Sequence, residues 1–157
     1  MAITRTAMVD DDGSGTTGTI INNAWKTEFY NQIDGVLGTA PFLDGPWTPT
    51  DGSGAGLAFA VASGGYVKLG PLVFASAQIA WPVTANGAST FVTLPVVPVG
   101  YPGWTYPGGL ITYTNYGSAI TIMLDSAGLH FFTVAGGPVT NANMSGKEVR
   151  FLAIYRY

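Results

Sequence analysis

The residue types best suited to chemistry gather around a single histidine. His130 is the only histidine among 157 residues, and Asp125 and Ser126 precede it closely. An acid, a hydroxyl and an imidazole are the parts of a hydrolytic triad, but a triad needs an orientation that adjacency in sequence cannot supply. The chain also lacks a Gly-x-Ser-x-Gly elbow. We expect His130 to be a strand residue at a sheet edge or subunit interface. The alternative is a metal ligand repeated three times on a trimer axis.

Two sets of carboxylates offer further chemistry. Asp125 and Glu148 could form the pair that glycoside hydrolysis requires, and they are the only acids after Asp51. The run 10–15 resembles the start of a calcium loop, yet its twelfth position is Ile21, where a bidentate carboxylate is needed. Phosphate-binding and dinucleotide motifs are absent from the sequence. We expect no enzyme, no metal site and no cofactor, with a carbohydrate-active enzyme as the alternative.

Charged side chains are scarce over most of the chain. Between Asp51 and Asp125, Lys68 is the only charged residue, and charged residues make up 10% of the composition, against about a quarter in an average protein. A soluble monomer normally covers its surface with such groups, so we expect sister copies of the chain to cover much of this surface. The six basic residues stand singly, which argues against a nucleic-acid partner.

Membrane and secretion signals are weak as well. The most apolar region, residues 91–104, is broken by three prolines and is too short to span a bilayer. The opening residues, MAITRTAMVDDDG, contain no apolar run of the length that a signal peptide needs. The chain has no cysteine, so the redox compartment stays undetermined. We expect neither membrane insertion nor export by a signal peptide.

One helix is expected near the N-terminus, after an extended arm. Asn22 or Asn23 can cap it, Gly35 can end it, and apolar side chains recur every four residues along one stripe. The stripe consists of Ile21, Trp25, Phe29 and Ile33. A helix of about 13 residues is marginal alone in water, so the stripe needs a partner surface. We assign residues 1–37 to anchoring and trimerisation, and the Gly/Pro-rich residues 38–56 to a linker without regular structure.

The remainder, residues 57–157, has the pattern of a domain built from short strands. The chain holds 22 glycines and 10 prolines as turn signals, with Val, Ile, Thr and aromatic residues between them. The candidate strands are 58–62, 66–69, 72–81, 90–94, 110–114, 119–124, 129–134 and 148–157. We therefore expect a mostly β protein, a jelly-roll-like antiparallel β-sandwich preceded by an N-terminal arm and one short helix.

Alternation within two of these strands predicts the faces of the sheet. The odd-numbered residues from Val73 to Trp81 are expected to face the core. In the last strand the odd-numbered residues are apolar, but so are Leu152 and Ile154 between them. Such a strand needs burial on both sides, which fits a sandwich whose outer face packs on a neighbouring subunit.

Aromatic residues cluster on and after a loop rich in proline and glycine. They are Tyr101, Trp104 and Tyr106, with Tyr113 and Tyr116 as a secondary cluster. Aromatic faces on a rigid loop can stack on sugar rings or anchor a protein partner. The alternative is that these rings fill the end of the sandwich or a subunit interface. We treat the five aromatic residues as candidate receptor contacts.

Three runs of sequence resemble tailed-bacteriophage fibre proteins. The run VDDDGSGTTGTIINNAWKTEFYNQID, an acidic Gly/Thr-rich turn followed by an aromatic helix, resembles the N-terminal segment of tail-fibre and head-fibre chains. The runs YVKLGPLVFASAQIAWPVTANG and SGKEVRFLAIYRY resemble the small β-sandwich at the C-terminal end of such fibres. An extended shaft repeat, typical of long tail fibres, is missing between them.

The resemblance implies a virion structural protein without enzymatic activity. It implies a homotrimer fixed to capsid or tail proteins by its N-terminal part, with the sandwich exposed and able to contact a glycan or protein of the host surface. The missing shaft leaves capsid and tail attachment both open. A capsid decoration protein without receptor function is the alternative.

Overall fold

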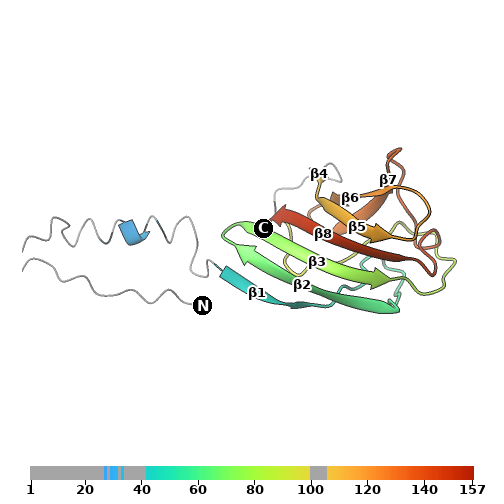
Figure 1. The fold of residues 1–157 in the computed structure, drawn as a ribbon, viewed down its shortest axis with the longest axis horizontal. Helices are drawn as coiled ribbons and strands as arrows, with labels where there is room; N and C mark the ends of the chain where they lie inside the picture. Colours follow the sequence, from blue (N-terminus) through green and yellow to red (C-terminus); the bar gives the residue numbers. More distant parts are fainter. Residues whose placement is uncertain (1–26, 28, 32, 34–41, 100–105) are drawn as a thin grey trace, which may run out of the picture.

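The computed structural model describes residues 27, 29–31, 33, 42–99 and 106–157 (Figure 1). These residues form eight strands in two antiparallel sheets, and the five described positions between 27 and 33 are helical. The prediction of a mostly β chain with antiparallel sheets and one short helix is therefore confirmed. No helix within the described ranges is long and apolar enough to cross a bilayer.

The larger sheet contains five strands in the order β1-β2-β3-β8-β5. Their bounds are β1 Phe42–Trp47, β2 Val61–Leu69, β3 Leu72–Ala80, β8 Glu148–Arg156 and β5 Gly109–Thr114. The smaller sheet has the order β4-β6-β7, with bounds β4 Tyr106–Pro107, β6 Ile120–Leu124 and β7 Leu129–Thr133. Every pair of neighbouring strands is antiparallel.

A tight hairpin joins the two strands at the centre of the larger sheet. β2 and β3 pair from Val61 opposite Ala80 to Leu69 opposite Leu72, so only Gly70 and Pro71 remain for the turn. Gly70 has a φ of 54°, which glycine adopts without the steric cost that other residues meet. The turn thereby fixes the register on which the rest of the sheet depends.

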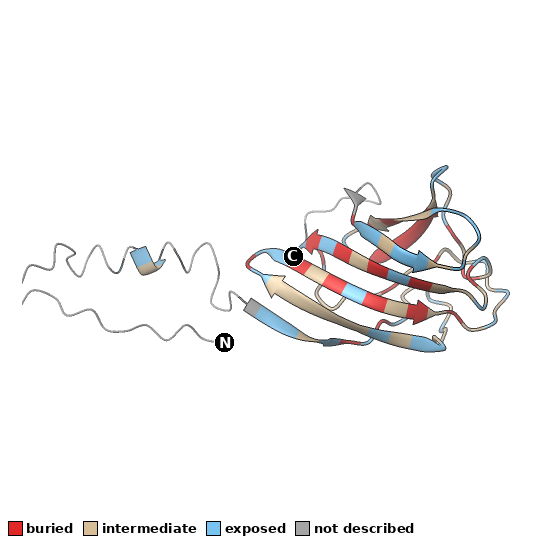
Figure 2. Ribbon diagram, in the orientation of Figure 1, coloured by how far each residue is buried: buried red, intermediate tan, exposed pale blue. Residues whose placement is uncertain are grey.

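One hydrophobic core lies between the two sheets. The odd-numbered residues from Val73 to Trp81 are buried, as the alternation predicted, and so are those from Val149 to Tyr155 in β8. Figure 2 shows the resulting bands of buried and accessible residues along β3 and β8. Phe131 of β7 makes edge-to-face contacts with Trp81 and with Phe151 of β8, each with ring centroids 5.8 Å apart. Both sheets therefore contribute to this core, as in a sandwich. The jelly-roll topology stays a prediction.

Two strand predictions were wrong. Residues 58–62 and 66–69, expected as separate strands, are replaced by the single strand β2. Gly64 lies within β2 without interrupting it. A Cβ at this position would lie 2.5 Å from the Ser76 carbonyl oxygen and 3.0 Å from the Trp47 ring, so only glycine fits there. Close backbone approach, and not a turn, explains this glycine. Residues 90–94 form no strand, because Val92 makes only isolated bridges, to Asp51 and Leu129.

The expected linker 38–56 is also wrong where the structure describes it. Its residues 42–47 form β1, which pairs with β2 along its whole length. Trp47 is buried in the core, and Asp51 bridges to Val92. β1 is an edge strand, where Pro46 costs no interior ladder hydrogen bond. Residues 38–41 lie outside the described ranges.

Candidate functional site

On the outer face of the larger sheet, the described side chains of β3 and β8 are exposed or half-buried. This face consists of side chains that alternate with the core residues and lie opposite one another in register. From one end of the sheet to the other, successive rows hold Leu69, Leu72 and Arg156; Asp44, Val67, Phe74 and Ile154; Pro46, Gly65, Ser76, Leu152 and Leu110; Ser63, Gln78, Arg150 and Tyr113. Large aliphatic side chains lie in the first three rows and polar side chains fill most of the fourth, so the face has two unlike halves.

The apolar half exposes large aliphatic side chains. We call Leu69, Leu72, Phe74, Leu110, Leu152 and Ile154 the apolar band. Within it, Leu110 is 62% exposed and Leu69 is 49% exposed, while Leu72 and Ile154 are exposed by 40% and 44%. Single exposed leucines are ordinary, whereas these side chains are neighbours on one sheet face. Asp44 of β1 and Arg156 of β8 flank the band on opposite sides.

The polar half is organised by one carboxylate. Oε1 of Glu148 accepts hydrogen bonds from Nε2 of Gln78 at 2.9 Å and from Nε of Arg150 at 2.7 Å. The guanidinium of Arg150 lies over the ring of Tyr113, 5.0 Å from its centroid. These four side chains come from β3, β8 and β5, so the strand register brings them together. We call them the polar row.

Two shallow hollows open on this face. The larger, of about 560 Å³, is lined by Asp44, Gly45, Pro46, Gly65, Tyr66, Val67, Phe74, Ser76 and Leu152. The smaller, of about 360 Å³, is lined by Ser63, Gly64, Gly65, Ser76, Ala77, Gln78, Thr112, Arg150 and Phe151. Gly65 and Ser76 line both hollows, so the two adjoin above these residues. Together they form a trough with an apolar end and a polar end.

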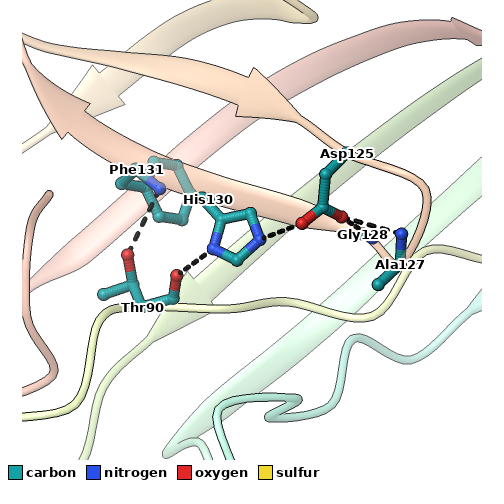
Figure 3. Close-up of polar contacts among 6 residues, drawn as sticks. All are labelled: Thr90, Asp125, Ala127, Gly128, His130 and Phe131. Atoms are coloured by element: carbon teal, nitrogen blue, oxygen red, sulfur yellow. Dashed lines mark hydrogen bonds and ion pairs between the residues drawn. The ribbon is translucent and has the colours of Figure 1, made fainter. Parts of the chain in front are cut away.

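His130 lies elsewhere, on β7, which is an edge strand of the smaller sheet, so the expected strand position at a sheet edge is confirmed, although the residue is buried. Its Nε2 is 3.0 Å from Oδ2 of Asp125, and its Nδ1 is 3.0 Å from the carbonyl oxygen of Thr90 (Figure 3). The imidazole is 6% exposed and stacks on Phe91, with ring centroids 4.7 Å apart. Both partners are acceptor oxygens, so both contacts are hydrogen bonds only for a ring with a proton on each nitrogen.

Asp125 completes a turn instead of a triad. Its Oδ1 accepts hydrogen bonds from the backbone N–H groups of Ala127 at 2.7 Å and Gly128 at 2.8 Å. Burial raises the pKa of Asp125, but these bonds and the charge and hydrogen bond of His130 outweigh it, so the pKa lies below its ordinary value. Ser126 is exposed, and both ring nitrogens of His130 already face other oxygens. This arrangement holds the β6–β7 hairpin and offers no activated nucleophile.

The predicted aromatic contacts are only partly described. Tyr113 is 46% exposed in the polar row, whereas Tyr116 is partly buried against the core. Tyr106 begins β4, and Tyr101 and Trp104 lie outside the described residues. The structure thus separates Tyr113 from Tyr116 and joins Tyr113 to Arg150, a pairing that alternation in two distant strands could have suggested.

The predicted helix stripe is likewise described in part. Phe29 is 44% exposed and Ile33 is half-buried, and both are helical. The ring of Phe29 lies 6.1 Å from that of Tyr30, at a tilt of 52°. Ile21 and Trp25 lie outside the described residues, so the stripe as a whole stays a prediction.

Neither a metal centre nor a relative identifies the site. In the part of the chain that the structure describes, no three His, Asp or Glu side chains are grouped so as to hold a metal ion. Asp125 and Glu148 belong to different clusters, one with His130 and one with Arg150. Comparison with protein-family models, with curated proteins and with solved structures finds no match. The likeness to phage fibre proteins therefore stays a prediction from the sequence.

Proposed function

We propose that the chain is a bacteriophage virion structural protein, a homotrimeric fibre or spike whose N-terminal part attaches to capsid or tail and whose sandwich contacts the host surface. The observation that supports self-association best is the apolar band. Four of its aliphatic side chains are at least 40% exposed in adjacent rows of one sheet. A chain with so few charges gains most by covering such a surface with another copy of itself.

The energetics favour association through more than one surface. Burying one large aliphatic side chain completely gains about 1.5–3 kcal/mol, and those of the band are already partly covered. A contact between two copies would thus gain on the order of 10 kcal/mol, similar to association costs of about 4–15 kcal/mol. The band and the N-terminal helix stripe would then act together, since linked contacts raise the effective concentration of each other.

The arrangement of charge fits a closed ring of copies. Asp44 flanks the band at the β1 edge, whereas Arg156 flanks it on β8. A cyclic trimer joins one side of each copy to the other side of its neighbour, so this polarity would bring opposite charges together. Exposed ion pairs add little affinity, but like charges facing each other would oppose assembly.

The mass of the full-length chain in solution tests self-association. We expect a trimer by light scattering, and a shift to monomer or weaker association when Leu72→Glu and Ile154→Glu are combined. Val83→Glu is the matched control, because Val83 is 91% exposed and lies outside the sheets. A monomeric wild-type chain at high concentration would overturn the proposal, and an unchanged mass in the double variant would remove the band from the interface.

A second measurement separates host attachment from decoration of the capsid. Particles whose copies end after residue 37 should still incorporate the chain but should adsorb poorly to host cells if the sandwich binds the host surface. Unchanged adsorption would instead support a decoration protein. Absence of the chain from purified particles would contradict both virion roles.

A further inference from the structure

We propose that the smaller hollow, at the polar end of the trough, binds a saccharide that carries a carboxylate. This inference rests on the proposed function, because it names the ligand class of the face that a virion spike would present. The polar end of the trough supplies hydroxyl, amide and guanidinium groups, and the exposed ring of Tyr113 beside Arg150 supplies aromatic carbon, while the apolar band is left for the contact between copies. A sugar acid has the matching parts: a carboxylate, ring hydroxyls and a face of C–H groups.

The polar groups are held in place before any ligand arrives. A single oxygen of Glu148 accepts from both Gln78 and Arg150, which fixes the amide and the guanidinium relative to each other. With Nε2 of Gln78 committed to Glu148, its Oε1 is presented as an acceptor. The backbone N–H of Glu148 donates to Oδ1 of Asn115 at 2.7 Å, which also holds Glu148 in place. Such preorganisation lowers the entropic cost of binding.

Arg150 provides the charge that selects an anion. Its Nε contacts Glu148 and its plane lies over Tyr113, while its Nη groups have no hydrogen-bond partner within the described residues. Two Nη groups match the two oxygens of a carboxylate in a bidentate pair. The ion pair with Glu148 partly neutralises the charge of Arg150, so the affinity of each site for the sugar should be low. Three sites on one spike would compensate through avidity.

Hydroxyl groups surround this guanidinium. Ser63 and Ser76 line the smaller hollow, and neither hydroxyl has a hydrogen-bond partner in the described part of the chain. Thr112 donates its hydroxyl proton to the Arg150 carbonyl oxygen at 3.2 Å and keeps its acceptor capacity. Groups that both donate and accept suit sugar hydroxyls, which also do both.

Gly65 keeps the trough open. It lies on the outer face between the two hollows, and a Cβ placed there would meet only the Gly45 carbonyl oxygen, at 3.5 Å. This is an ordinary contact, and the backbone of Gly65 is not in the left-handed region. The fold therefore tolerates a side chain at this position. Its absence leaves room for a ligand beside Gln78, Ser76 and Arg150 at the polar end of the trough.

Binding of defined oligosaccharides to the full-length chain tests the inference. The probes are oligosaccharides that end in glucuronic or sialic acid, with neutral oligosaccharides of equal length and an aspartate-rich peptide for comparison, titrated by calorimetry. We expect the acidic sugars to bind at least about tenfold more tightly than the neutral sugars, since a charged hydrogen-bond pair is lost without the carboxylate. Equal binding of the peptide, or no binding of acidic sugars, would overturn the inference.

Two variants locate the site. Arg150→Gln should weaken acidic-sugar binding about tenfold or more, and Gly65→Leu should abolish it by filling the trough. The control for Arg150→Gln is Lys68→Gln, which removes a positive charge that lies over the Tyr157 ring, 3.8 Å from its centroid. The control for Gly65→Leu is Gly87→Leu, because the space around the Cβ position of Gly87 is open. Unchanged binding in Gly65→Leu would overturn the inference. A trimeric chain that does not bind acidic sugars would contradict this inference alone. A monomeric wild-type chain would contradict the proposed function.

Discussion

The outer-facing residues of the two sheets differ in how far they are buried. On the smaller sheet, His130 and Phe132 of β7 alternate with core residues and are nevertheless buried. Phe91 stacks on His130, and Pro138 bridges to Phe132, so other segments of the chain cover this side. On the larger sheet, the corresponding outer positions of β3 and β8 stay exposed or half-buried. One side is closed by the chain itself, and the other stays open among the described residues.

Polar groups follow the same division. A buried network at the closed side links the Trp81 indole N–H to Oδ1 of Asn141 at 3.2 Å and Nδ2 of Asn141 to Oγ of Ser53 at 2.9 Å. Among the described residues, every buried side-chain nitrogen and oxygen has a hydrogen-bond partner. The open face instead presents Ser63 and Ser76 without such partners. Buried polar groups need protein partners, whereas accessible hydroxyl groups such as these bond to water until a ligand replaces it.

The largest effect should come from the core between the two sheets, to which Trp81 belongs. Trp81 is 2% exposed, contacts Phe59 and Phe131, and donates to Asn141. Trp81→Ala should lower the free energy of unfolding by about 3–5 kcal/mol, since it leaves a cavity and an unpaired amide. Ile154→Ala on the open face should cost less than about 1.5 kcal/mol in the isolated subunit. Equal losses for both variants, measured by denaturant unfolding at concentrations that keep the chain monomeric, would contradict the division.

The sequence allowed the core side of the larger sheet to be predicted, because alternation of side chains has a period of two in any strand. The closed side was not predictable in this way. Burial of His130 depends on Phe91, which reaches it through isolated bridges that local patterns do not encode. β1 was missed because Gly45 and Pro46 read as turn signals. The polar row depends on a contact between Gln78 and Glu148, 70 residues apart, which only the strand register creates.

An intermediate effect on the free energy of unfolding is expected where Phe91 packs against the smaller sheet. A Cβ at Gly128 would lie 2.6 Å from the Val92 carbonyl oxygen and would collide with the Phe91 ring. Gly128→Ala should therefore displace Phe91 and lower the free energy of unfolding by about 1–3 kcal/mol, as overpacking commonly does. Gly87→Ala is the matched control, because no atom lies within 4 Å of its Cβ position. Equal melting temperatures for the two variants would show that Phe91 is not held against this sheet.

The smallest effect is expected on the loss of stability at acid pH. Despite desolvation, hydrogen bonds from Ala127 and Gly128 and the proximity of His130 hold the pKa of Asp125 below its ordinary value of 3.8. A depressed folded-state pKa stabilises the protein above the unfolded-state pKa, and this stability is lost as the pH falls through 3.8 and then through the folded value. Asp125→Asn should remove part of that loss, so its free energy of unfolding should change less between about pH 5 and 2.5.

Asp51 supplies a comparison on the same side of the molecule. Burial raises the pKa of Asp51, but hydrogen bonds from Ser53, Leu57 and Gly56 outweigh this effect. The pKa of Asp51 is therefore below its ordinary value, like that of Asp125. Acid should therefore still destabilise Asp125→Asn, by a smaller amount than wild type, and combining it with Asp51→Asn should flatten the profile further. Each effect should be on the order of 1 kcal/mol or less, since both carboxylates are partly solvated. Parallel acid profiles for wild type and both variants would show that these turns contribute no charge-dependent stability to the closed side.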